Sequence, residues 1–108
     1  MKYALLAYNS PDLDQRGPIT HEIAVALARP NVSSWVRLQS AGSATTVSSP
    51  DGKTLLTDGP FVDSKEYLGG LIVIEAVDLD EALAVAAEFQ SLMRSFGVIE
   101  VRPILETG

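Results

Sequence analysis

Residues 71–83 read LIVIEAVDLDEAL, so a strand pattern runs almost directly into a helix pattern. The first four residues, 71–74, are all apolar, which predicts a strand that is buried on both faces. Asp78 can cap a helix, and Glu81 stands three residues later, at the spacing of a capping box. The stretch therefore predicts the strand-to-helix half of a strand–helix–strand unit.

The second strand of that unit, and a matching unit at the start of the chain, complete the pattern. Helical periodicity continues from Leu79 to Gly97, a residue suited to stop a helix, and 99–102 then alternates apolar and charged residues. In the first half, 2–8 predicts a strand that is apolar on both faces. A short helix from His21 to about Arg29 follows, capped by Thr20.

A further strand at 32–38 closes the first half, and a hairpin is inserted before the second. Residues 44–48 are rich in β-branched side chains, 49–52 form a turn signal, and 53–57 return as the second arm. The whole chain, 1–108, then forms one α+β domain of ferredoxin-like βαββαβ type. We expect one antiparallel sheet with both helices on one face, as in dimeric α/β barrels.

Two helices can cover only one face of such a sheet. Because the strands at 2–8 and 71–74 are apolar on both sides, the second face would expose a large apolar patch in a single subunit. A two-fold partner is the simplest cover, so we expect a homodimer that forms through the sheet face.

Composition narrows the functional classes. The chain has a net charge of −6 with scattered basic residues, which argues against nucleic acid as a partner. It has no cysteine, which excludes a disulfide framework, a thiolate nucleophile and a cysteine zinc site. No apolar run approaches membrane length, so we expect a cytoplasmic protein with no membrane partner.

Several short motifs occur in order between residues 44 and 104. They are ATTV at 44–47, DGK at 51–53, TDGPF at 57–61, KEYLGG at 65–70, DLDEA at 78–82 and EVRP at 100–103. Together they resemble the DGPF group of YCII-related proteins. The resemblance covers about two thirds of the chain. The acid after the motif is Asp63 where glutamate is usual, and the segment 9–42 is unlike the family average.

The resemblance implies a ferredoxin-like fold that dimerises through its sheet, and a cleft that binds a small molecule. Activity in that family is mostly unassigned. Some YCII-like relatives use a His/Asp pair for elimination or lactone chemistry, and DGPF proteins are often associated with extracytoplasmic-function sigma factors.

Three residues are candidates for acid–base chemistry: His21, Asp58 and Asp63. A histidine at a helix start beside the cleft would be kept neutral and able to accept a proton, with Asp58 or Asp63 as its partner. The structural alternative makes His21 a surface residue. In that alternative Asp58 is part of a rigid turn in which Gly59 adopts an unusual torsion and Phe61 anchors the turn in the core.

Four residues are candidates for ligand binding: Arg37, Phe61, Lys65 and Tyr67. Arg37 or Lys65 would bind an anionic group, and the two aromatic residues would line a pocket. Each can also be an ordinary interface or core residue. One histidine and no cysteine make a metal site improbable, and we expect no cofactor.

Two functions fit these residues. The first is a small-molecule-binding or regulatory module of YCII type, linked to a sigma factor or a biosynthetic pathway. The second is a cofactor-free lyase or isomerase that acts on a small anionic substrate through the His/Asp pair. The sequence favours the first function, because it contains no complete catalytic constellation.

Overall fold

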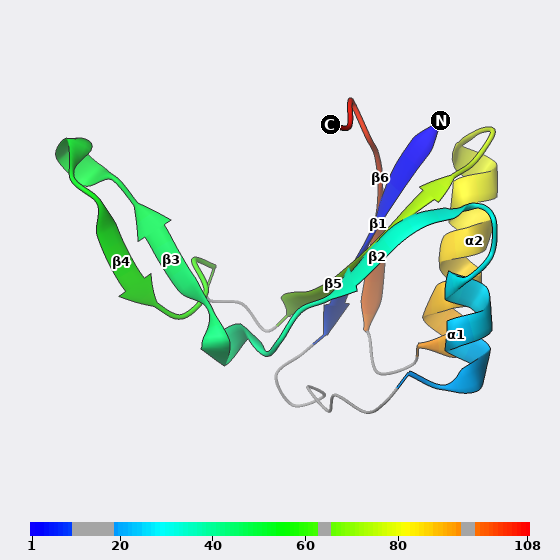
Figure 1. Cartoon of the computed structure of the whole chain (residues 1–108), viewed down its shortest axis with the longest axis horizontal. Coiled ribbons are helices and arrows are strands. Elements are labelled where there is room, and N and C mark those ends of the chain that lie inside the picture. Colours follow the sequence, from blue (N-terminus) through cyan, green and yellow to red (C-terminus); the bar gives the residue numbers. More distant parts are fainter. Residues whose placement is uncertain (10–18, 63–65, 94–96) are drawn as a thin grey trace.

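The computed structural model describes residues 1–9, 19–62, 66–93 and 97–108. Its two α-helices and six strands follow each other as the sequence predicts, with two short 3-10 turns between them. Their bounds are β1 Lys2–Asn9, α1 His21–Leu27, β2 Val32–Arg37, η2 Ala41–Ser43, β3 Thr45–Ser48, η3 Pro50–Gly52, β4 Leu55–Asp58, β5 Tyr67–Glu75, α2 Leu79–Leu92 and β6 Val98–Pro103. Figure 1 shows this arrangement.

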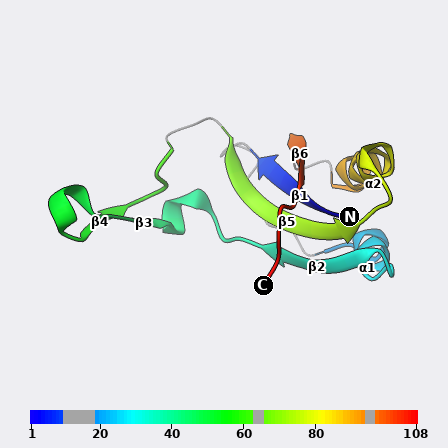
Figure 2. The ribbon, with the colours of Figure 1, turned by 90° about the horizontal axis from the view of Figure 1, so that it is seen from above.

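Four strands form the main sheet, in the order β2-β5-β1-β6. Every neighbouring pair is antiparallel. Both helices cover the same face of this sheet, while β3 and β4 lie on its other side (Figure 2). The α+β class and the inserted hairpin are therefore confirmed, and the strand order is compatible with a ferredoxin-like βαββαβ domain.

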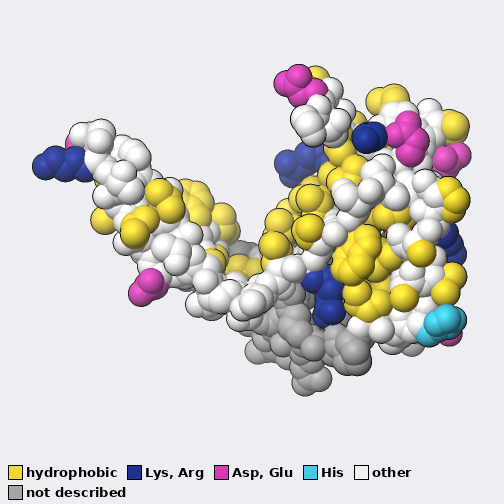
Figure 3. All heavy atoms as spheres, viewed as in Figure 1, with side chains coloured by type: hydrophobic (Ala, Val, Ile, Leu, Met, Phe, Trp, Pro, Cys, Tyr) yellow, Lys and Arg dark blue, Asp and Glu magenta, His cyan; other side chains and the backbone are white. Residues whose placement is uncertain are grey.

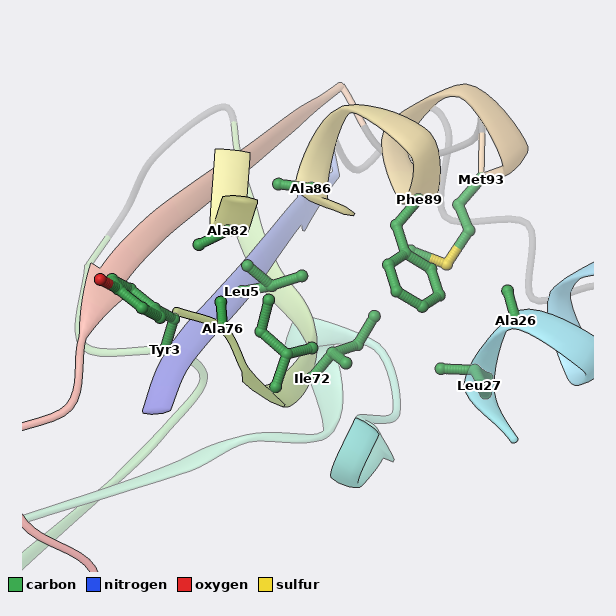
Figure 4. Packing of buried hydrophobic residues seen from close by; sticks show 11 residues of the cluster. Tyr3, Leu5, Ala26, Leu27, Ile72, Ala76, Ala82, Ala86, Phe89 and Met93 are labelled. Carbon is green, nitrogen blue, oxygen red and sulfur yellow. The ribbon is translucent and has the colours of Figure 1, made fainter. Parts of the chain in front are cut away.

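The core lies between the sheet and the two helices (Figure 4). Along β1 every second residue is buried, so Tyr3, Leu5 and Ala7 face the helices. Phe89 of α2 is 1% exposed and belongs to the same core cluster as Leu5 and Ile74, the other two largest fully buried side chains. Apolar burial of this kind is the main stabilising contribution to a domain without disulfides.

Both helices begin at the caps that the sequence predicts. Asp78 Oδ1 accepts a hydrogen bond from the Glu81 backbone N–H at 2.9 Å, and Glu81 Oε1 accepts one from the Val77 N–H at 3.3 Å. Thr20 Oγ1 accepts from the Ile23 N–H at 3.3 Å. These bonds satisfy backbone donors that the first turn of a helix leaves free. In the described part of the chain, neither helix is long and apolar enough to cross a membrane.

Some predicted boundaries are wrong. Helix α2 ends at Leu92 and not at 96, because Met93 leaves helical geometry with φ −108° and ψ 63°. Helix α1 ends at Leu27, two residues before Arg29. Strand β5 begins at Tyr67, so the glycine pair before residue 71 belongs to the strand.

The hairpin β3–β4 projects from the sheet as an arm, which we define as residues 44–62 (Figure 1). Gly59 closes its base: it has φ +97°, and its N–H donates to the Ala44 carbonyl at 2.7 Å. The predicted unusual torsion at this glycine is thus confirmed. Phe61, however, is 85% exposed and does not anchor the turn in the core of its own chain.

The arm makes the chain elongated. The radius of gyration is 15.5 Å, whereas a compact domain of this length has about 13 Å. The principal extents are 44 × 32 × 19 Å. A large part of the arm therefore lies outside the packed body of the domain.

Candidate functional site

Several predicted site residues meet at one end of the sheet. Arg37 is the last residue of β2, Tyr67 is the first of β5, and His21 is the first of α1. All three element ends lie at the lower end of the molecule in Figure 1, where β1 also ends, at Asn9. We refer to this region as the loop end. The topology therefore brings together residues that stand far apart in the sequence.

The strand register places Arg37 and Tyr67 on the helix-facing side of the sheet. Arg37 is opposite Gly70, which is in turn opposite the buried Ala7 of β1. Tyr67 is opposite Asn9, which continues the buried alternation of β1. Asn9 is 7% exposed and is the buried polar residue of the described chain.

Small residues occupy the sheet positions beside Arg37. Arg37 and Ile99 flank a row whose two central positions are Gly70 and Ala7. Gly70 and Ala7 are both buried. A Cβ atom placed on Gly70 would come within 3.1 Å of the Val36 carbonyl oxygen, so the close approach of the β2 backbone favours glycine at this position.

The next row toward the middle of the sheet carries larger side chains, from Trp35, Ile72, Leu5 and Val101. Ile72 and Leu5 belong to the core cluster and Val101 packs against it, whereas Trp35 on the edge strand is 42% exposed. The change from large to small side chains coincides with a β-bulge, because the pairing of β1 with β5 shifts between Ala7 and Tyr8. Bulges are common beside functional sites, where they redirect side chains.

The described side chains at the loop end offer groups whose chemistry suits a small anion. The guanidinium of Arg37 offers planar, charge-assisted hydrogen bonds to a carboxylate. Tyr67 offers an aromatic face and a hydroxyl, and Asn9 offers both a donor and an acceptor. Arg37, Tyr67 and Asn9 each have an interaction within the chain, so none of them is without a partner.

His21 lies at the same end of the molecule but is exposed in the first turn of α1. Asp58 ends β4 in the arm, on the side of the sheet that faces away from the helices (Figure 2). Within one chain, the structure therefore does not bring His21 and Asp58 together. Asp63 and Lys65 lie outside the described residues, and their roles stay predictions.

A second polar group lies on the uncovered face of the sheet. Arg102 Nη2 donates to Glu100 Oε1 at 2.7 Å, and the Tyr8 hydroxyl donates to the same oxygen at 3.5 Å. The alternation of β6 places Glu100 and Arg102 on this face. The Arg102 side chain is 65% exposed, so this pair is a surface ion pair of small energetic weight.

Among the residues that the structure describes, no group of three or more histidine, cysteine, aspartate or glutamate side chains is placed to hold a metal ion. The described side chains at the loop end offer the guanidinium of Arg37, the amide of Asn9 and the aromatic ring of Tyr67.

The fold and the loop end define a small α+β domain with a polar site beside a β-bulge. The YCII-related domain family matches residues 1–107, and the chain belongs to this family. It is also similar to an uncharacterized protein of Rhizobium meliloti (strain 1021), with 33% identity over 96% of this chain and 92% of that protein. The resemblance seen in the DGPF motif is thereby confirmed at the level of the family.

Proposed function

We propose that this protein is a small-molecule-binding module that holds a small carboxylate at the loop end. The observation that supports the proposal is the strand register, which places Arg37, Tyr67 and the buried Asn9 on one side of the sheet at its loop end. A guanidinium, an aromatic ring and an amide on one side of a sheet end are groups that recognise a carboxylate with a planar body.

The ligand class follows from the charges and shapes at the loop end. Arg37 selects a carboxylate over a neutral amide, since the amide cannot form the charge-assisted pair. Tyr67 can stack on a planar body attached to that carboxylate. A regulatory role with a sigma factor and proton transfer by His21 are further functions. Each would use a bound ligand, and each goes beyond the binding function proposed here.

The fluorescence of Trp35 can report ligand binding at the loop end. Trp35 is the single tryptophan, and it stands two residues before Arg37 on the same side of β2. Acetate, pyruvate and benzoate should be titrated against the purified protein while Trp35 fluorescence is recorded, with acetamide and benzamide as neutral counterparts. We expect at least one carboxylate to give a saturable change that its amide does not give.

The variant Arg37→Gln should weaken that carboxylate by about tenfold or more, the loss expected for one charge-assisted hydrogen bond. Arg102→Gln is the matched control, because it removes a similar charge from the opposite face of the sheet. The proposal is wrong if no carboxylate saturates, or if Arg37→Gln binds as tightly as the unchanged protein.

A further inference from the structure

The arm contains both Asp-Gly pairs of the chain, Asp51-Gly52 and Asp58-Gly59. In such a pair the glycine nitrogen can attack the carboxyl carbon of the aspartate side chain, because glycine has no Cβ to shield that nitrogen and its backbone torsions are free. The structure places the two pairs at opposite ends of the hairpin. Asp51-Gly52 lies in the turn between β3 and β4, at the end of the arm that stands clear of the body, and Asp58-Gly59 closes the base (Figures 1 and 3).

The pair at the base is held by hydrogen bonds on both sides of Gly59. The Gly59 N–H donates to the Ala44 carbonyl at 2.7 Å, and the Gly59 carbonyl accepts from Thr46 Oγ1 at 2.8 Å. Asp58 is the last residue of β4 and is paired with Thr45 across the hairpin. The Gly59 nitrogen can therefore reach the Asp58 carboxyl carbon only after the base of the arm opens.

The pair at the far end of the arm is held more weakly. The Gly52 N–H donates to the Ser49 carbonyl at 3.3 Å, which is long for a hydrogen bond between backbone groups. Asp51 has φ 55°, in the left-handed region that costs free energy for a residue with a side chain. Both Asp51 and Gly52 are exposed. Opening this turn breaks one long bond and relieves the torsion, so it costs less free energy than opening the base.

We propose that Asp51 is a site of spontaneous isomerisation to isoaspartate. The Gly52 nitrogen forms a bond to Cγ of Asp51, the amide proton and the carboxyl hydroxyl leave as water, and a succinimide ring results. Water then opens the ring. Addition at the side-chain carbonyl restores aspartate, whereas addition at the main-chain carbonyl leaves the chain linked through Cγ, as isoaspartate. Water is the co-reactant in the second step and the product of the first.

Isomerisation changes the arm because the turn sets the register of the hairpin. Isoaspartate lengthens the backbone by one methylene group and moves the free carboxylate to the main-chain carbon. We expect the pairing of Val47 with Leu56 to weaken as a result. The inference goes beyond the proposed carboxylate binding and does not rest on it, because the arm lies on the other side of the sheet (Figure 2).

Trypsin, which cleaves after lysine and arginine, separates the two sites into the peptides 38–53 and 54–65. The purified protein should be kept in mildly acidic buffer and digested at intervals. Chromatography then resolves the isomeric peptides, and electron-transfer fragmentation assigns the modified residue. We expect isoaspartate to form at Asp51 at least about fivefold faster than at Asp58, the factor that one net backbone hydrogen bond contributes. Equal rates, or a faster rate at Asp58, would overturn the proposal.

Two comparisons test whether the folded arm sets this difference. In urea the two rates should become similar, because the hydrogen bonds at both ends of the arm are lost; a difference that persists in urea would overturn the structural assignment. In the folded protein, Thr46→Val removes the bond to the Gly59 carbonyl and should speed isoaspartate formation at Asp58. Thr57→Val is the matched control, because Thr57 is the cross-strand partner of Thr46. An equal Asp58 rate in the two variants would show that the base is not what protects this residue.

Discussion

Arg29 and Glu88 form an ion pair that joins the residues after α1 to the outer side of α2. Arg29 Nη2 donates to Glu88 Oε1, and this hydrogen bond, more than the charge attraction, holds the pKa of the Glu88 carboxyl below its ordinary value of 4.5. The same contact raises the pKa of Arg29. Both side chains are partly exposed, so the pair orients the helices more than it stabilises them.

This pair predicts a specific pH dependence. Because the pKa of Glu88 is lowered in the folded state, its contribution to stability is present above the unfolded pKa and is lost as the pH falls through the folded one. A carboxyl-detected NMR titration should show that Arg29→Gln raises the Glu88 midpoint toward 4.5. Arg102→Gln should leave that midpoint unchanged. An unchanged Glu88 midpoint in Arg29→Gln would contradict the contact.

The second prediction concerns the core. Phe89 is 1% exposed and packs between α2 and the sheet, so Phe89→Ala should lower the free energy of unfolding by about 3–5 kcal/mol, through lost burial and the cavity left behind. Leu83→Ala, on the outer side of the same helix, should cost much less. Urea denaturation followed by circular dichroism measures both. Similar losses in the two variants would mean that α2 does not pack on the sheet through Phe89.

The third prediction concerns the start of α2. Asp78→Ala removes the side chain that accepts from the Glu81 N–H, and loss of such a cap costs about 1 kcal/mol. Asp80→Ala is the control, because Asp80 is also acidic and in the first turn but is not the N-cap residue. Thermal denaturation should rank Asp78→Ala below Asp80→Ala. The reverse order would show that the helix dipole matters more here than the cap.

The main elements were predictable from sequence because their signals are local. The apolar run at 71–74, the Asp78 cap and the turn at 49–52 each favour one structure through short-range physics, and all three are confirmed. The end of α2 was not predictable, because the apolar pattern continues past Met93 while the backbone already leaves the helix. Periodicity does not say where tertiary packing stops a helix.

The site was less predictable than the fold, since it depends on register. The sequence marks Arg37 and Tyr67 as candidates, but only pairing through Gly70 and Asn9 places them on one side of the sheet. Asn9 was not among the predicted site residues, because it ends a strand and begins a turn-rich segment. The expected role of Phe61 as a core anchor is wrong, because the arm that carries Phe61 diverges from the body of the domain. No local sequence pattern indicates the direction in which the arm leaves the sheet.

The row of small residues at the loop end leads to the last prediction. Ala7 lies beside Gly70 on the helix-facing side and, although 2% exposed, is not part of the core cluster, so Ala7→Val should lower the free energy of unfolding less than a valine placed in that cluster. Ala82→Val is the control: Ala82 is 0% exposed in the core cluster, where added methyl groups cost about 1–3 kcal/mol. If Ala7→Val is the more destabilising variant, the loop end is as densely packed as the core. If it is well tolerated, it should also weaken the carboxylate response of Trp35, because the added methyl groups lie in the same row as Arg37.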